Sequence, residues 1–505
     1  MKKLLSLVLA VILMLSCIPM ASAESYNHLP QVYVEGLESK HIFYKDDVNM
    51  ENPLFYPING DMLLSKLVKY EENISKAVAQ GNPDLIAEYL HQWMLDCYGM
   101  VALDKDGFTM RDDVMVPATE LNYEGDGKYV FKYDTRLDPM DIAVELDAYI
   151  KWVMSETRAE KVEIAASSYG ASVALAYITK YPARKSIIDS MVLCVPATNG
   201  VNFASALFSG KLEFDPLALK AMVDSLDVGE PVSLLLSTLI KTGALATILD
   251  GAVEPVLEAA LSRALQLVIR DVFGTFPSMW TFIEHKDFYD ALEFVYGENY
   301  ADENHEYAVH IARITNYHET VMNHSYDIVA DAVKSGIHVG ILTKYGEAPI
   351  PIGDGGNLMG DGFVALDKAS FGATSSMNQE KLPADYKQQK HTEYNLMSPE
   401  GCVDASTCLL PFNTWFIRGI AHGSKNDGYY ELINTVLYEN LDVFSSEKFP
   451  QYLMVPEYDN GALVPMTADI QPDEEKQTSW LQDFMAFIRS VIPMLIEKIK
   501  AFFVK

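Results

Sequence analysis

The sequence predicts an α/β protein whose central sheet is mostly parallel and covered by helices on both faces. Three observations lead to this prediction. Residues 139–156 have the spacing of an amphipathic helix, residues 162–166 form an apolar strand that runs directly into a helix beginning at Tyr169, and residues 190–195 form a second apolar strand after that helix. Strands that alternate with helices in this way form parallel pairs, because each helix returns the chain to the starting edge of the sheet.

The remaining elements extend the same pattern. Asp138 is placed to cap the helix at 139–156, and Pro139 suits its first turn. Gly36 ends a short β-branched strand that starts at Gln31. Further strands are expected over residues 129–134, 337–342 and 415–421, and a further helix over residues 429–441.

A long helical block interrupts the strand pattern. Residues 202–334 read as helical segments, among them 217–226, 231–249 and 255–272. This block is too long for a simple crossover between two strands, so it is expected to be a cap inserted into the sheet domain. Residues 347–413 are rich in Gly, Pro, Ser and Asn and are expected to form long loops over the functional edge of the sheet.

The start of the chain has the features of a secretory signal peptide. A basic start precedes an apolar stretch at residues 4–15 and a small-residue cleavage site that ends at Ala23. Met14 stands where a lipoprotein signal would have Leu, Val or Ile before Cys17, which favours ordinary cleavage. The protein is therefore expected to be secreted or associated with the cell envelope.

The resulting division of the chain has five parts. They are a signal peptide (1–23), a first part of the sheet domain (24–201), the helical cap (202–335), a second part of the sheet domain (336–470) and a C-terminal amphipathic helix (471–505). The last segment is strongly apolar but contains Arg489, Pro493, Glu497 and Lys498, so it lacks the uninterrupted run needed to span a bilayer. It either lies on a membrane surface or packs onto the body of the protein.

Charge and cysteine content exclude several classes of partner. The formal net charge is −31, which repels phosphate backbones and argues against nucleic acid. No spacing of Cys or His suggests a zinc site, and no glycine-rich nucleotide-binding pattern precedes a helix. Of the mature cysteines, Cys194 lies in an apolar run, whereas Cys402 and Cys408 are close enough in sequence to form a disulfide.

The turn between residues 162–166 and the following helix carries the most informative motif. It reads Ala166-Ser167-Ser168-Tyr169-Gly170, with small residues two positions on either side of Ser168. Such a turn, between a strand and a helix, is where a serine hydrolase presents its nucleophile. Ser167 and Ser172 are rivals by residue type, but the first has Tyr169 two positions on and the second lies inside the helix.

A nucleophilic serine needs a histidine base and a carboxylate that orients the base. In hydrolases with this turn the chain order is Ser, acid, His. His422 follows the strand at 415–421, which places it at the carboxyl end of a strand. Asp361 lies between two glycines after the strand at 337–342, and Asp354 is its main competitor.

The tetrahedral intermediate of ester hydrolysis also needs two backbone N–H donors. One is expected from Tyr169, which follows the nucleophile, and the other from Leu37, which follows Gly36 after the first strand. Ser168, Asp361 and His422 are thus the expected catalytic residues, and Leu37 and Tyr169 the expected oxyanion hole. No metal or cofactor is required.

The motifs together resemble those of a known family. Val32 to Leu37, residues 130–134, the Ser168 turn, residues 193–200 and residues 360–364 look like segments of α/β-hydrolase lipases related to the lecithin:cholesterol acyltransferases. The likeness covers roughly residues 30–200 and 336–445 and only weakly the helical insertion. It implies an α/β-hydrolase fold, hydrolysis or acyl transfer on lipid esters, and a lid role for the insertion.

The leading hypothesis is a secreted serine esterase or lipase that cleaves lipid or other hydrophobic acyl esters. Two alternatives stay open. Glu35, which precedes the oxyanion glycine, and the long loops at 347–413 also fit a catalytically silent protein that binds a cell-envelope lipid or glycan. An acyltransferase would use the same residues and differ only in the acceptor.

Overall fold

The central feature of the computed structural model is one sheet of eight described strands, in the order β12-β11-β10-β7-β6-β5-β1-β4. Every neighbouring pair is parallel except the edge pair β11 and β12. The strands are β1 (Gln31–Val34), β4 (Lys128–Phe131), β5 (Val162–Ser167), β6 (Ile188–Cys194), β7 (His338–Tyr345), β10 (Thr414–Arg418), β11 (Tyr452–Met454) and β12 (Val464–Pro465). The structure describes residues 28–37, 42–47, 54, 60–109, 113–115, 128–211, 254–347, 350, 352, 358–378, 380–456 and 461–467.

Helices cover both faces of this sheet, as the sequence predicts for an α/β protein. One face packs against α5 (Pro139–Thr157), α6 (Tyr169–Lys180) and α15 (Ser325–Lys334), and the other packs against α17 (Asp427–Glu439). The side chains alternate accordingly, since Val32, Ile164 and Ile341 face the first helical layer and Leu342 faces the second. The core therefore lies on both sides of the central strands, which is typical of buried parallel sheets.

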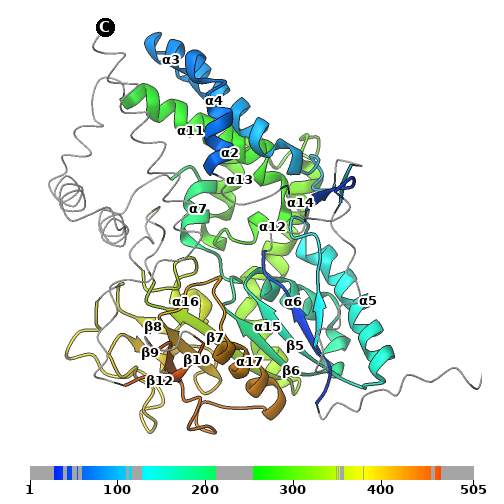
Figure 1. Ribbon diagram of the computed structural model, residues 1–505, viewed down its shortest axis with the longest axis vertical. Coiled ribbons are helices and arrows are strands. Elements are labelled where there is room, and N and C mark those ends of the chain that lie inside the picture. Colours follow the sequence, from blue (N-terminus) through cyan, green and yellow to red (C-terminus); the bar gives the residue numbers. More distant parts are fainter. Residues whose placement is uncertain are drawn as a thin grey trace, which may run out of the picture.

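A helical layer stands over the carboxyl edge of the sheet, in the upper half of Figure 1. The described residues between β6 and β7 are helical, which agrees with the predicted insertion. They form α7 (Asn202–Phe208), α11 (Glu254–Asp271), α12 (Pro277–Trp280), α13 (Phe288–Tyr296) and α14 (Ala308–Thr320), in addition to α15. A separate apolar core of this layer surrounds the buried Trp280, Phe288 and Leu292.

At two places, helices pack across the boundaries expected between the parts of the chain. The helices α2 (Gly60–Leu67), α3 (Glu71–Ala79) and α4 (Pro83–Tyr98) belong by sequence to the first part of the sheet domain, but α4 packs against α11 and α3 packs on α4, in one cluster with Ala77, Ile86 and Ala260. Conversely, α15 ends the insertion but packs on α6 and β7. The helical layer is thus built from two separated segments of the chain (Figure 1).

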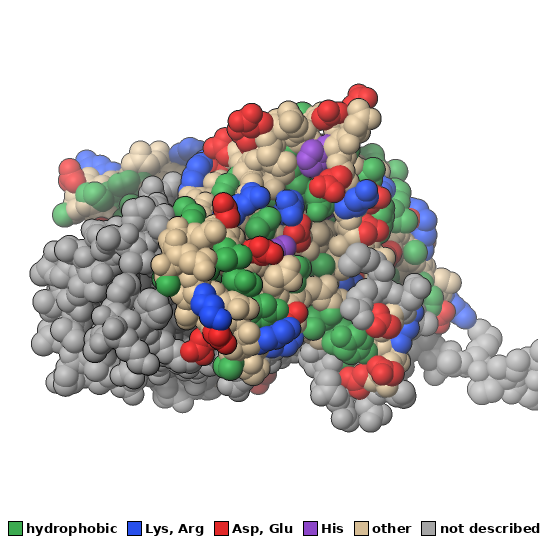
Figure 2. Space-filling view, turned by 90° about the horizontal axis from the view of Figure 1, so that it is seen from above, with side chains coloured by type: hydrophobic (Ala, Val, Ile, Leu, Met, Phe, Trp, Pro, Cys, Tyr) green, Lys and Arg blue, Asp and Glu red, His purple; other side chains and the backbone are tan. Residues whose placement is uncertain are grey.

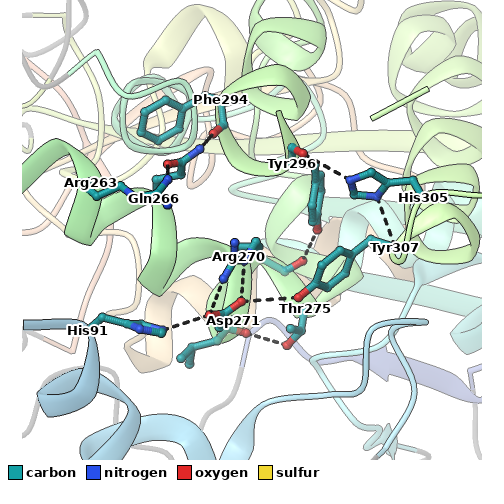
Figure 3. Close-up of polar contacts among 12 residues, drawn as sticks. His91, Arg263, Gln266, Arg270, Asp271, Thr275, Phe294, Tyr296, His305 and Tyr307 are labelled. Carbon is teal, nitrogen blue, oxygen red and sulfur yellow. Dashed lines mark hydrogen bonds and ion pairs between the residues drawn. The ribbon is translucent and has the colours of Figure 1, made fainter. Parts of the chain in front are cut away.

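A partly buried carboxylate joins these two segments. Asp271, at the end of α11, lies 3.0 Å from His91 Nε2 of α4 and accepts two hydrogen bonds from the Arg270 guanidinium. Tyr307 donates a longer hydrogen bond of 3.4 Å to the same carboxylate (Figure 3). Burial alone would raise the pKa of Asp271, but the hydrogen bonds from His91 and Arg270 outweigh burial and hold this pKa well below its usual range.

The other described elements are short and lie in loops. They are β2 (Phe43–Tyr44) paired with β3 (Val114–Met115), β8 (Thr374–Ser375) paired with β9 (Val403–Asp404), and α16 (Leu366–Ala369). Residues 358–378 and 380–413 are otherwise mostly irregular, as expected, and pack on the end of the sheet around Leu366, Leu396 and Val403.

Cys402 and Cys408 do not form a disulfide. Both are buried free thiols, and their Sγ atoms donate to the carbonyls of Glu380 and Ala405, respectively. Proximity in sequence was the basis of the disulfide hypothesis, but a disulfide also needs the two Cβ atoms to face each other at short range. The remaining described cysteines, Cys97 and Cys194, are buried free thiols too.

Several expectations fall outside the described residues. They concern the signal peptide, the helical segments at 217–226 and 231–249, Asp354, and the C-terminal helix at 471–505. Within the described ranges, no helix combines the length and apolar character needed to cross a bilayer. Figure 2 shows acidic, basic and hydrophobic side chains intermixed on the described part of the face seen from above.

Candidate active site

Ser168 lies on a sharp bend between β5 and α6, at the carboxyl edge of the sheet. Its backbone has φ 54° and ψ −118°, a conformation that residues with a side chain rarely adopt. The bend is held because the Ser168 N–H donates to the carbonyl of Cys194 on the neighbouring strand, at 2.8 Å. The strain turns the side chain out of the sheet edge, and Ser168 is partly exposed although both of its neighbours are buried.

The small residues around Ser168 are required by the close approach of backbones. A Cβ on Gly170 would lie 2.4 Å from the carbonyl oxygens of Val34 and Glu35, which is far inside van der Waals contact. A Cβ on Gly36 would lie 3.2 Å from the Cβ of Ser168. The chain after β1 therefore runs directly beside the Ser168 turn, and only glycine at position 170 permits this approach.

The structure brings the three predicted catalytic residues together. His422 Nε2 lies 2.8 Å from Ser168 Oγ, and His422 Nδ1 lies 2.7 Å from Asp361 Oδ2. Since an ionised carboxylate only accepts hydrogen bonds, Nδ1 carries the proton and Nε2 is left to accept the Ser168 hydroxyl proton. This is the arrangement in which the imidazole acts as a base toward the serine.

Asp361 is held by its own loop. Its Oδ1 accepts from the N–H groups of Phe363 at 3.0 Å and Val364 at 2.7 Å, so both carboxylate oxygens are occupied. The residue is 1% exposed. Its flanking glycines are necessary, because Gly362 has φ 87° and a Cβ on Gly360 would lie 2.4 Å from the carbonyl oxygen of Val364.

His422 is displaced from the strand end that the sequence indicated. The strand β10 ends at Arg418, because Gly419 adopts φ 78° and turns the chain. His422 then follows in the loop between β10 and α17, and its backbone N–H donates to the carbonyl of Asp361 at 3.0 Å. The loop position was predicted correctly, whereas the extent of the strand was not.

The two predicted oxyanion donors belong to two segments that adjoin Ser168. Tyr169 is the first residue of α6, where a backbone N–H has no acceptor within its own helix. Leu37 follows Gly36, whose Cα stands against the Ser168 turn. Helix α6 also directs its positive end at the Ser168 turn, which suits a developing negative charge.

The rival residues are less well placed. Ser167 is buried in β5, and Ser172 is fully buried inside α6. His310 and His318 are fully buried in the helical layer, and burial lowers the pKa of each to about 3. These two histidines are neutral core residues at ordinary pH.

A small recess with polar and apolar lining lies beside the loop of Asp361. The Phe363 ring lines this recess and also lies against His422, with 4.9 Å between the ring centroids. On its other side Phe363 contacts Phe203 of α7 edge to face, at 5.1 Å between centroids. The recess is lined by Asn202, Phe203, Ile350, Leu358, Gly360, Gly362, Phe363, Val364 and Ala365.

Sequence reasoning missed two parts of this site. Phe203 and Phe363 were not assigned to a pocket, because an aromatic side chain in a loop gives no sign of its neighbours. Lys344 was also missed, because a single lysine just after the strand expected at 337–342 is not a distinctive pattern. It is buried directly beneath the His422 loop.

Replacing Gly170 with alanine is expected to lower the free energy of unfolding by about 3 kcal/mol and to abolish activity, because the added Cβ must push apart two backbones. Denaturant unfolding of both proteins measures the difference. Gly99→Ala is the matched control, since a Cβ there meets only Leu95 at 3.8 Å, and its effect is expected to stay within about 1 kcal/mol. Equal unfolding of Gly170→Ala and its parent would contradict this account of the turn.

Within the described residues, no group of three or more His, Cys, Asp or Glu side chains is arranged to hold a metal ion. Comparisons of the chain with protein-family models, with curated proteins and with solved structures found no match. The case for a function therefore depends on the geometry described above.

Proposed function

We propose that this protein is a serine hydrolase that cleaves carboxylic esters with hydrophobic acyl groups. The observation that carries the proposal is the continuous hydrogen-bonded series from Ser168 Oγ through His422 to Asp361, at a strained turn on the carboxyl edge of a parallel sheet. A structural role alone does not account for a serine held at positive φ with its hydroxyl on a histidine.

In the first half of the proposed reaction, Ser168 Oγ attacks the ester carbonyl while His422 Nε2 takes its proton. The carbonyl oxygen becomes an oxyanion and is stabilised by the N–H groups of Tyr169 and Leu37. Asp361 stabilises the imidazolium that forms, and the two N–H groups on its other oxygen keep it from turning away.

In the second half, His422 gives its proton to the leaving alcohol and the acyl group stays on Ser168. His422 then activates a water molecule, which attacks the acyl-enzyme and restores the serine. An alcohol in place of water would give acyl transfer by the same steps. No metal or cofactor takes part in this proposal.

The apolar side chains beside the triad support a hydrophobic acyl group as substrate. Phe363 lies against His422 and contacts Phe203, and Leu358, Val364 and Ala365 line the same small recess. Burial of each methylene of an acyl chain against these side chains contributes about 0.8 kcal/mol to the free energy of binding. A hydrophobic substrate agrees with the likeness of the sequence motifs to lipases related to the lecithin:cholesterol acyltransferases. We include a relationship to these lipases in the proposal. We also propose that the protein is exported.

A fluorophosphonate probe tests the proposal directly, because the oxygen of a serine with a competent histidine base attacks its phosphorus, fluoride leaves and the serine is phosphonylated. We expect one probe per chain, located on the peptide that contains Ser168 by mass spectrometry, and hydrolysis of nitrophenyl butyrate and octanoate in the same preparation. Heat-denatured protein is the control and should not react. A folded protein that does not react would favour a catalytically silent lipid- or glycan-binding protein.

A further inference from the structure

Lys344 is a buried lysine in the penultimate position of β7, on the face of the sheet that α17 covers. It is 1% exposed, and no carboxylate of the described residues forms an ion pair with it. Burial of an ammonium group without an ionic partner is unfavourable, so other interactions must stabilise Lys344 in this position.

The ammonium of Lys344 is surrounded by backbone carbonyls of a single loop. Its Nζ donates to the carbonyls of Ala421 at 3.2 Å, His422 at 3.2 Å and Ser424 at 2.5 Å. An ammonium has three N–H donors, and each has one acceptor here. The Nζ also lies 4.3 Å from the centroid of the Tyr429 ring, within range of a cation–π interaction.

These hydrogen bonds hold the backbone of His422 in place. The His422 carbonyl accepts from Lys344, and the His422 N–H donates to the Asp361 carbonyl. With both ring nitrogens also engaged, every polar group of His422 has a partner. Removing the ammonium would release three carbonyls of the loop at once, while the contacts of Asp361 would remain.

We propose that Lys344 is a positioning residue of the triad. Its ammonium binds the backbone carbonyls of the 421–424 loop and thereby sets the distance between His422 and Ser168. The inference rests on the proposed hydrolase function and adds a residue to it. The displacement of a catalytic group by about 1 Å can lower the rate about 100-fold, so a loop held by one side chain is a sensitive point.

The charge of Lys344 makes the arrangement dependent on pH. Burial lowers the pKa of Lys344 to about 8, although Asp361 and Glu347 act in the opposite direction and Lys425 adds to the lowering. Of the other groups nearby, burial raises the pKa of Cys194 to about 11 and that of Tyr429 well above its usual value. Neither therefore titrates in the same range.

The direction of the pH effect follows from the donors that remain. Below a pH of about 8 the folded protein carries the ammonium with three N–H donors, and above it a neutral amine with two. One carbonyl then loses its donor and the other two lose the contribution of the charge. The reactivity of Ser168 is thus expected to be full on the acid side of this pKa and to fall as the pH rises through it.

The rate of fluorophosphonate labelling of Ser168, measured from about pH 7 to about pH 9.5, tests the inference across the range in which Lys344 titrates. In the parent protein we expect the rate to fall with a midpoint near the pKa of Lys344. In Lys344→Met we expect a rate about 100-fold lower at neutral pH that shows no such fall. Circular dichroism and thermal unfolding establish that the variant is folded.

Lys425→Met is the matched control on the same loop. Lys425 is exposed, and its Nζ donates to the Tyr33 hydroxyl at 2.6 Å rather than to the loop. We expect its labelling rate at neutral pH to equal that of the parent, and its alkaline midpoint to move slightly to higher pH, because burial mainly lowers the pKa of Lys344 and the positive charge that adds to this lowering is removed. This shift remains measurable if Lys344→Met does not fold.

Each outcome decides between the alternatives. Labelling of Lys344→Met at the parent rate, or the same alkaline midpoint in Lys344→Met and the parent, would overturn the role of Lys344 and leave the proposed function intact. An unmoved midpoint in Lys425→Met would also count against it. Failure of the parent protein to label at any pH would overturn the proposed function, and this inference with it.

Discussion

Replacing Ser168 with alanine is expected to lower kcat for ester hydrolysis about a million-fold, to the level that binding and the oxyanion donors alone provide. The reason is that Ser168 Oγ, which lies 2.8 Å from His422 Nε2, is the hydroxyl that the histidine is placed to activate. KM is expected to stay within a few fold, because the hydroxyl contributes to the reaction and hardly to binding. Steady-state hydrolysis of nitrophenyl octanoate gives both constants.

Ser172→Ala serves as the matched control for this experiment. It also removes a serine hydroxyl from the start of α6, but one that is fully buried. We expect it to keep activity within a few fold of the parent. If Ser168→Ala kept more than about one hundredth of the parent kcat, a nucleophile at this position would be ruled out.

The second large effect is expected for Asp361→Asn, which should lower kcat about ten-thousand-fold with little change in fold. The amide keeps the size of the carboxylate, but it no longer requires a proton on Nδ1 and cannot stabilise the imidazolium. The same hydrolysis assay measures the loss, and circular dichroism establishes the fold. Since Oδ1 accepts two backbone hydrogen bonds, the amide oxygen can take its place.

Asp354→Asn distinguishes between the two acids that the sequence offered. We expect this variant to retain the parent kcat, because Asp361 is the carboxylate in contact with His422 Nδ1. A large loss in Asp354→Asn together with an active Asp361→Asn would reverse the assignment of the acid.

The residues of the candidate site could be predicted from sequence because the backbone geometry restricts which residue types can occupy neighbouring positions. The bend at Ser168 brings backbones so close that Gly170 has no substitute, and the loop of Asp361 needs Gly360 and Gly362. Such requirements leave small residues at fixed positions. The order of serine, acid and histidine along the chain then selected Asp361 and His422 from many candidates.

Other features had no local signature. The helices α2 to α4 have ordinary amphipathic patterns, and nothing in residues 60–98 indicates that α4 packs on α11. Lys344 is one charge in an apolar strand, a pattern that also fits an edge position. The end of β10 was misplaced because Gly419 was taken as part of the strand, whereas its positive φ ends it.

The assembly of the helical layer from two distant segments has a consequence for how the chain folds. α4 ends at Tyr98 and its partner α11 begins at Glu254, so the described strands β4, β5 and β6 of the central sheet are synthesised before the two can meet. Contacts between residues so far apart are slow to form, because a long loop must close first. Until α11 arrives, the apolar face that includes Ile86 is uncovered, and a chain interrupted before residue 254 is expected to be prone to aggregation.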